Sequence, residues 1–192
     1  MSPIVAKRSE KTFTPAPSGT HQAVCVDVVD LGFMESAFTP GKRQHKISVV
    51  WQIAERMENG KPFLTQQRYT LSLDEKANLR RDLESWRGKP FTDAELGGFD
   101  VESVIGANCL LSIVHVERKG NVYANVKSVM PLMKGMPKMI GESYVRVQDR
   151  EPRPDVEPDD QTPDMVDADD IPFAFLLPLI LPALMAAHTV MA

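Results

Sequence analysis

Apolar and polar residues alternate in five short stretches of this chain, the pattern of half-buried β-strands. These stretches cover, in order, residues 21–29, 42–54, 63–71, 108–116 and 122–130. In the second stretch one face carries only apolar side chains, so it is expected to line the core: Ile47, Val49, Trp51 and Ile53. Alternation in the last stretch assigns Val122, Ala124 and Val126 to the core in the same way. Asn59-Gly60 favours a tight turn between the second and third strands.

A helix is expected between the third and fourth strands. Ser72 and Glu75 have the spacing of a capping box at its start. Leu79, Leu83 and Trp86 follow at the spacing of one helical face, and Gly88 followed by proline ends the helix. Thr92 and Glu95 repeat the capping pattern ahead of a shorter turn.

Two connections are expected to be loops. The stretch 31–41 contains two glycines and a proline and is expected to be a loop that carries Phe33 and Phe38. Residues 117–121 join the last two strands as a hairpin with a basic tip.

The resulting order, β-β-β-α-β-β, predicts an all-β domain over residues 21–134. Five short strands with a helix between the third and fourth are typical of the OB-fold, a partly open five-stranded Greek-key barrel. Strands do not alternate regularly with helices, which argues against a βαβ fold, and an SH3-like barrel lacks the capped helix. The polar residues 1–20 are expected to form a flexible N-terminal arm.

The end of the chain differs in composition from this domain. Residues 135–172 are rich in acidic residues and prolines and are expected to be a disordered tail. Residues 1–141 contain 19 Lys and Arg against 15 Asp and Glu, whereas residues 142–192 contain 3 against 11. A mildly basic body with a strongly acidic tail indicates an interaction with a polyanion.

The sequence contains no motif of a catalytic or cofactor site. Nucleotide-binding loops, serine-hydrolase motifs and zinc-protease motifs are all missing, so we expect a protein that is not an enzyme and holds no cofactor. The four histidines have no metal-ligand spacing, so no metal site is expected. Cys25 and Cys109 lie in strand-like runs and form no CxxC pair, which predicts free buried thiols in a reducing cytoplasm.

Cationic and aromatic side chains on the predicted barrel form a candidate interface for single-stranded nucleic acid. Sequence-independent binding combines cations that follow the phosphates with aromatic rings that stack on bases. Strand alternation, the start of the second strand and the tip of the last hairpin together give the candidate residues Lys42, Arg43, Lys46, Arg68, Arg118, Lys119, Tyr123 and Lys127. Solvated surface charge is the alternative for each cation taken singly, and a position at the barrel rim is the alternative for Tyr123.

The most specific motif lies near the end of the acidic tail. Its residues Asp169, Asp170, Ile171, Pro172 and Phe173 match the Asp-Asp-Ile-Pro-Phe tip of bacterial single-stranded DNA-binding proteins, which the tail therefore resembles. In that family the tip follows an OB-fold and a disordered linker and docks replication and repair proteins. The resemblance implies that the same five residues bind such partners here. In the family, however, the phenylalanine is the last residue and its free carboxylate takes part in docking.

The body is similar to phage-encoded proteins assigned to single-strand binding. The stretches that carry this similarity are 69–73, 83–88 and 123–126, within a region from about residue 13 to residue 135. The resemblance implies a phage or prophage single-stranded DNA-binding protein that acts in DNA replication or recombination in the cytoplasm of a bacterial host. It leaves open the oligomeric state and the choice between DNA and RNA.

Residues 173–192 form a hydrophobic segment without Asp, Glu, Lys or Arg. The segment is long enough to cross a bilayer, but Pro178 and Pro182 would break or kink a helix, and no basic cluster flanks it. A membrane span, a segment that packs on the barrel or on a partner, and an extension without function remain open. An alternative function follows, namely an OB-like protein-interaction or structural module that this segment anchors to a membrane or an assembly.

Overall fold

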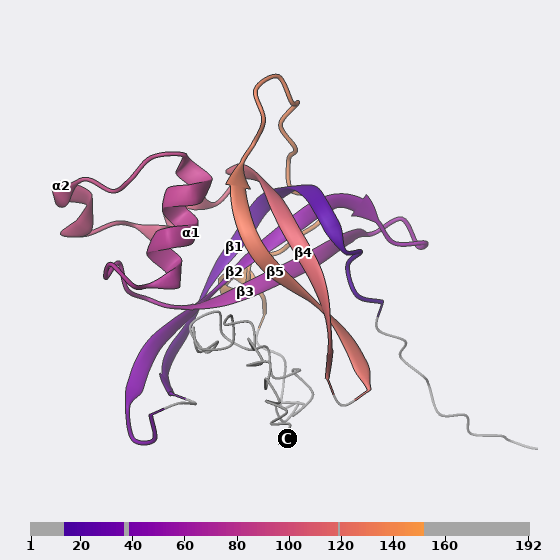
Figure 1. Ribbon diagram of the computed structural model, residues 1–192. Coiled ribbons are helices and arrows are strands. Elements are labelled where there is room, and N and C mark those ends of the chain that lie inside the picture. Colours follow the sequence, from indigo (N-terminus) through magenta and orange to yellow (C-terminus); the bar gives the residue numbers. More distant parts are fainter. Residues whose placement is uncertain (1–13, 37–38, 119, 152–192) are drawn as a thin grey trace, which may run out of the picture.

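The computed structural model describes residues 14–36, 39–118 and 120–151, which form a five-stranded antiparallel sheet with one main helix (Figure 1). The strands are β1 (Gly19–Glu35), β2 (Arg43–Arg56), β3 (Pro62–Thr70), β4 (Asn108–Arg118) and β5 (Asn121–Pro131). The helices are α1 (Asn78–Arg87) and α2 (Asp93–Leu96), and two short 3₁₀ turns follow, η1 (Val101–Val104) and η2 (Val147–Asp149). The predicted all-β class and the position of the helix are confirmed.

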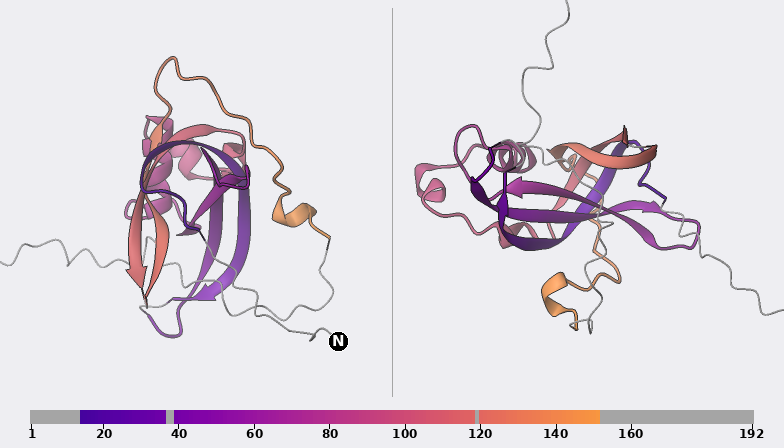
Figure 2. Two further views of the ribbon diagram at one scale, coloured as in Figure 1. Left: turned by 90° about the vertical axis from the view of Figure 1, so that its right-hand side faces the viewer. Right: turned by 90° about the horizontal axis from the view of Figure 1, so that it is seen from below.

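The strands lie in the order β3-β2-β1-β4-β5, so β1 is central and β3 and β5 are the edges. Strand β1 pairs with β2 along most of its length but with β4 only through residues 19–24. Two bulges, at Val26 and Leu31, interrupt the pairing of β1 with β2. Bulges increase local twist and bend a strand, and the sheet is strongly curved (Figures 1 and 2).

Helix α1 lies between the two edge strands and hydrogen-bonds to both sides of the curved sheet. The Tyr69 hydroxyl of β3 donates to Asp82 Oδ2 at 3.0 Å, and the Ser85 hydroxyl donates to the Val129 carbonyl of β5 at 2.6 Å. Trp86 Nε1 donates to the Asn108 carbonyl at the start of β4, at 2.9 Å. These three hydrogen bonds connect the helix to β3, β4 and β5.

The core lies between α1 and the concave face of the sheet. The predicted core face of β2 is confirmed, because Ile47, Val49, Trp51 and Ile53 are all buried. The predicted apolar face of α1, Leu79, Leu83 and Trp86, packs against it, and the Trp51 and Trp86 ring centroids lie 6.0 Å apart. Gly88 ends α1 in the left-handed conformation (φ +66°), as its position predicted.

Two local predictions are wrong. Stretch 31–41 is not a continuous loop, because β1 runs on to Glu35 and places Phe33 directly opposite His45 of β2. Ser72 does not cap α1, since the helix begins at Asn78 and the Ser72 hydroxyl instead accepts the Asp74 N–H at 3.0 Å in a local turn. The second predicted capping box, between Thr92 and Glu95, is present at the start of α2.

Residues 137–150, here called the C-terminal strap, cross the convex face of β1 and β2 (Figure 2). Met139 and Tyr144 pack against an apolar patch formed by Val24, Val26 and Val50. The prediction of a disordered tail from residue 135 onward is therefore wrong for residues 135–151. Side chains of the strap bury apolar surface on the sheet there.

Both ends of the expected domain differ from its predicted bounds. The folded body extends beyond residue 134 to residue 151, and it begins before residue 21, since Ala16 is buried and its carbonyl accepts a hydrogen bond from the His115 ring at 2.8 Å. The remainder of the expected arm, the rest of the acidic tail and the hydrophobic segment 173–192 lie outside the described residues. Within the described parts of the chain, no helix has the length and apolar character needed to cross a membrane.

Candidate nucleic-acid interface

Two hairpins project from the same side of the sheet and carry several of the predicted nucleic-acid-binding residues (Figures 1 and 2). Lys42 and Arg43 lie exposed at the end of the β1–β2 hairpin. Arg118 and Tyr123 lie on the β4–β5 hairpin, where both are half-buried. Lys119 is also predicted to bind nucleic acid, but it lies outside the described residues.

The β1–β2 hairpin also carries an exposed aromatic residue, Phe33, within the stretch that the sequence predicts to be a loop. The Phe33 and His45 rings are stacked, with centroids 4.9 Å apart and planes at 21°, and Phe33 is 61% exposed. Arg43 Nη2 donates to the Phe33 carbonyl at 2.8 Å. No local sequence signal marks this pair. Regular pairing continued from Ala23 and Ile53 would place Phe33 opposite Arg43, and the two bulges of β1 shift its partner to His45.

Asp30 fixes the base of this aromatic pair. Its Oδ1 accepts the Gly32 N–H at 2.7 Å and lies 2.7 Å from His45 Nε2. The Gly32 N–H, together with the His45 ring, lowers the pKa of the Asp30 carboxyl below its usual value. Gly32 has φ +70°, a conformation that favours glycine, next to the Leu31 bulge. The bulge and the carboxylate thus set the direction in which Phe33 leaves the strand.

Lys46 does not provide a surface cation. It alternates along β2 with the core residues Ile47 and Val49, as predicted. It is nevertheless only 2% exposed, so the expected exposed position is wrong. Ser48 and Gln52, on the same face of β2, are buried as well. Arg68 lies opposite Ser48 on β3 and is half-buried. The convex face of β2 is therefore closed where the sequence pattern indicated an exposed polar strip.

A bulge in β5 changes the predicted faces of that strand. Ile113 pairs with Val126 and Ser112 with Ser128, which leaves the exposed Lys127 unpaired in the ladder as the bulged residue. Beyond the bulge the alternation shifts, so Val129 is buried. Val122, expected in the core, is 43% exposed, because the hairpin extends past the core there.

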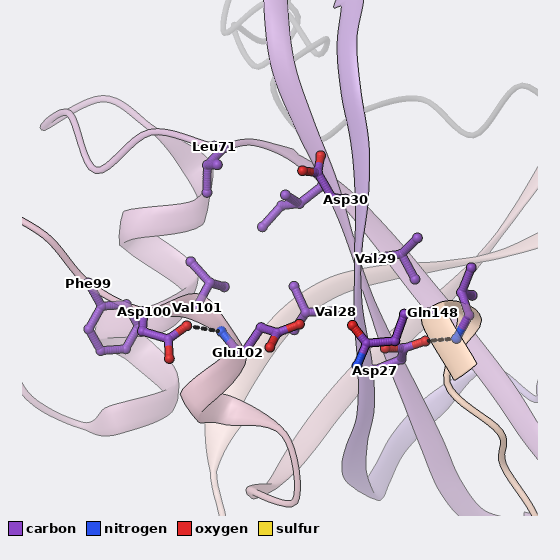
Figure 3. Close-up of a pocket in the computed structure, with 12 residues that line it drawn as sticks. Asp27, Val28, Val29, Asp30, Leu71, Phe99, Asp100, Val101, Glu102 and Gln148 are labelled. Atoms are coloured by element: carbon purple, nitrogen blue, oxygen red, sulfur yellow. Dashed lines mark hydrogen bonds between the residues drawn. The ribbon is translucent and has the colours of Figure 1, made fainter. Parts of the chain in front are cut away.

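A separate cavity of about 480 Å³ lies between β1, η1 and η2 (Figure 3). Four carboxylates line it, from Asp27, Asp30, Asp100 and Glu102, beside apolar side chains that include Phe99 and Leu71. One arginine, Arg146, reaches two of these carboxylates. A phosphate backbone would be repelled by this excess of negative charge. The hairpins, and not this cavity, are therefore the candidate surface for a polyanion.

Asp27, which is 1% exposed, anchors the C-terminal strap at the edge of this cavity. Its carboxylate accepts the Val147 N–H at 2.8 Å, the Tyr144 hydroxyl at 3.0 Å and Arg146 Nε at 3.1 Å. Burial alone would raise the pKa of this carboxyl, but these three donors hold the pKa below its usual value. Arg146 also bonds Glu102 Oε1 at 2.6 Å, so the strap connects β1 to η1.

The predicted partner-binding residues, Asp169 to Phe173, lie outside the described residues. Among the described residues, no group of three or more His, Cys, Asp or Glu side chains is arranged to hold a metal ion. Comparison of the sequence with known protein families finds no family model that matches it, and a search of the curated proteins finds no significant match.

Proposed function

We propose that this protein binds single-stranded DNA without strong sequence preference and that its acidic tail recruits proteins of replication or recombination. One observation carries the proposal: two hairpins with cationic and aromatic side chains project from the same side of the sheet. On the sequence resemblance given above, it would act as a phage-encoded protein in a bacterial host.

The strand order supports an OB-like fold. In an OB-fold the first strand pairs with the second and the fourth, as β1 does here. Edge strands β3 and β5 approach each other beside α1, as in a barrel that is open between them. OB-folds bind oligonucleotides with the loops between strands 1 and 2 and between strands 4 and 5. Those loops correspond to the two projecting hairpins.

The chemistry of the hairpins favours a single strand over a duplex. Lys42 and Arg43 supply charge for phosphates, and Phe33 and Tyr123 supply rings that bases can stack on. Stacking on a side chain requires an unpaired base, which a duplex does not offer without melting.

The proposal is tested by titrating the full chain with oligo-dT and with duplex of the same length over a series of salt concentrations. We expect tighter binding to oligo-dT, with an affinity that falls as salt rises because counterions are released. Replacing both Lys42 and Arg43 by Ala should lower the salt slope by about 0.7 for each lost phosphate contact. Lys134→Ala is the matched control, because this exposed lysine lies in the segment after β5, on the side away from the hairpins. Equal affinity for duplex, or no binding at low salt, contradicts the proposal.

The recruiting role rests on Asp169, Asp170, Ile171, Pro172 and Phe173. Carboxylates suit a basic rim and the two apolar side chains suit a pocket within it. A chain cut after Phe173 regains a terminal carboxylate at the position where the bacterial family has one. We expect this shortened chain to bind host replication and repair proteins more tightly than the intact chain in a peptide titration or a pull-down. Equal binding by both chains would count against use of the tip in that way.

A further inference from the structure

Packing in the core does not account for the position of Phe33. It belongs to neither buried apolar cluster of the described residues, and its ring is 61% exposed on a two-stranded ribbon that extends past the core. One face of the ring is covered by His45, 4.9 Å away between centroids. An aromatic side chain this exposed offers a π-face on which a base can stack.

The surrounding residues hold this ring in place. Arg43 Nη2 fixes the Phe33 carbonyl, and Asp30 Oδ1 lies within hydrogen-bond distance of the His45 ring. The His45 ring therefore backs the phenyl ring from an anchored position. A ring that is already oriented loses less conformational entropy when a second ring stacks on it.

From this arrangement we propose that Phe33, backed by His45, is a stacking site for one unpaired base, with Lys42 and Arg43 placed to meet the phosphates on either side of it. The inference rests on the proposed function and deepens it, since it names the part of the ligand that this hairpin recognises. Two carboxylates lie on the same hairpin and accept hydrogen bonds within it: Asp30 from Gly32 and His45, and Glu35 from the Gly41 N–H at 2.8 Å.

The test compares two oligonucleotides of equal length and charge, oligo-dT and a strand of abasic sites, which keeps the phosphates and lacks the bases. Wild-type protein should bind oligo-dT more tightly, and Phe33→Ala should lower its affinity for oligo-dT by about 5- to 150-fold, the range for one stacked base. The same variant should leave affinity for the abasic strand nearly unchanged. Lys42→Ala should weaken binding to both strands by a similar factor, because Lys42 is exposed and its removal takes away a phosphate contact.

Further variants separate stacking from a structural role. Phe33→Tyr keeps an aromatic face and should retain the preference for oligo-dT, whereas Phe33→Leu keeps apolar bulk and should lose it. Met133→Ala is the matched control, since Met133 is equally exposed at 61% and lies in the segment that follows β5, away from the hairpins. Thermal melting of each variant checks that the fold is kept.

The outcomes distinguish this inference from the function on which it rests. If the wild type binds neither strand, the proposed function and the inference both fail. If the wild type binds both strands equally, or if Phe33→Ala binds DNA and keeps the full preference for oligo-dT, the protein binds single strands but the stacking site is not Phe33. Loss of the preference in Phe33→Leu together with its retention in Phe33→Tyr supports the inference.

Discussion

Replacing Asp27 by Asn should release the C-terminal strap from the sheet. The change keeps the shape of the side chain but removes its charge and replaces one acceptor oxygen by an NH₂ group. Three donors of the strap then face a side chain that can accept on one atom only: the Tyr144 hydroxyl, the Arg146 guanidinium and the Val147 N–H. At least one of these groups loses its partner.

The magnitude follows from these contacts. Hydrogen bonds to a charged group contribute about 1.5–3 kcal/mol each, and breaking a buried ion pair costs about 3–5 kcal/mol. Arg146 retains Glu102 as a second partner, which limits the loss. We therefore expect Asp27→Asn to lower the free energy of unfolding by about 2–4 kcal/mol at neutral pH.

Urea unfolding of the full chain measures this loss, and Asp149→Asn is its control. Asp149 lies on the same strap, is exposed, and should change stability by less than about 0.5 kcal/mol. Trypsin provides a second readout, because cleavage after Lys138 and Arg146 should become faster in Asp27→Asn but not in the control. A change in stability no larger than that of Asp149→Asn would refute the assigned anchoring role.

The pH dependence of the same variant has a definite sign. Because the folded-state pKa of Asp27 is lowered, its contribution is complete above the unfolded pKa of about 3.9 and is lost as pH falls through the folded value. The difference between wild type and Asp27→Asn should therefore stay constant from about pH 5 to pH 8 and shrink below about pH 4. A difference that persists unchanged at pH 2 would indicate a cause other than the carboxylate charge.

Four further predictions concern other parts of the chain. Gly88→Ala should destabilise the protein by about 1–2 kcal/mol in urea unfolding, because the residue that ends α1 has φ +66°; an unchanged midpoint would contradict this. Burial raises the pKa of the Cys25 thiol to about 12, so its reaction with a thiol reagent at pH 8 should follow unfolding and should not occur rapidly in the native state. Tyr123→Ala should weaken oligo-dT binding by about 1–3 kcal/mol at an unchanged salt slope, whereas Lys127→Ala should lower the slope by about one phosphate contact; a lower melting temperature with normal DNA binding would instead mark Tyr123 as structural. Residues 152–192 contain eight acidic residues against one basic residue, so their removal should tighten DNA binding at low salt, with a gain that fades as salt rises, and no gain at low salt would refute competition by the tail.

Sequence alone predicts the parts of the fold in which apolar residues recur at a regular spacing, every second residue in a strand or every three to four residues in a helix. Ile47 to Ile53 alternate without interruption, and all four apolar residues of that set are buried. Leu79, Leu83 and Trp86 keep the helical period in the same way. A regular period needs no information from distant residues, because the geometry of a strand or helix fixes which positions share a face.

The failures occur where distant residues decide the local structure. Lys127 is a bulged residue because of the register that β4 imposes, and no local pattern marks it. The strap residues have no regular apolar period and the sequence therefore predicts a tail, but Tyr144 and Arg146 bind a carboxylate more than a hundred positions earlier in the chain. The two glycines and the proline of residues 31–41 predict a loop at Phe33, whereas Gly32 lies next to a bulge within a strand.

The central position of β1 has a consequence for how the chain folds. Its pairing with β4 joins residue 19 to residue 113, so most of the domain must be synthesised before this ladder can form. Until then β1, β2 and β3 can form only a three-stranded meander whose concave face, with Val49 and Trp51, lacks part of its cover. Non-local pairing of this kind slows folding and leaves apolar surface exposed to aggregation. Docking of β4 is therefore expected to limit the folding rate, and fragments that end before residue 108 should be insoluble where the full chain is not.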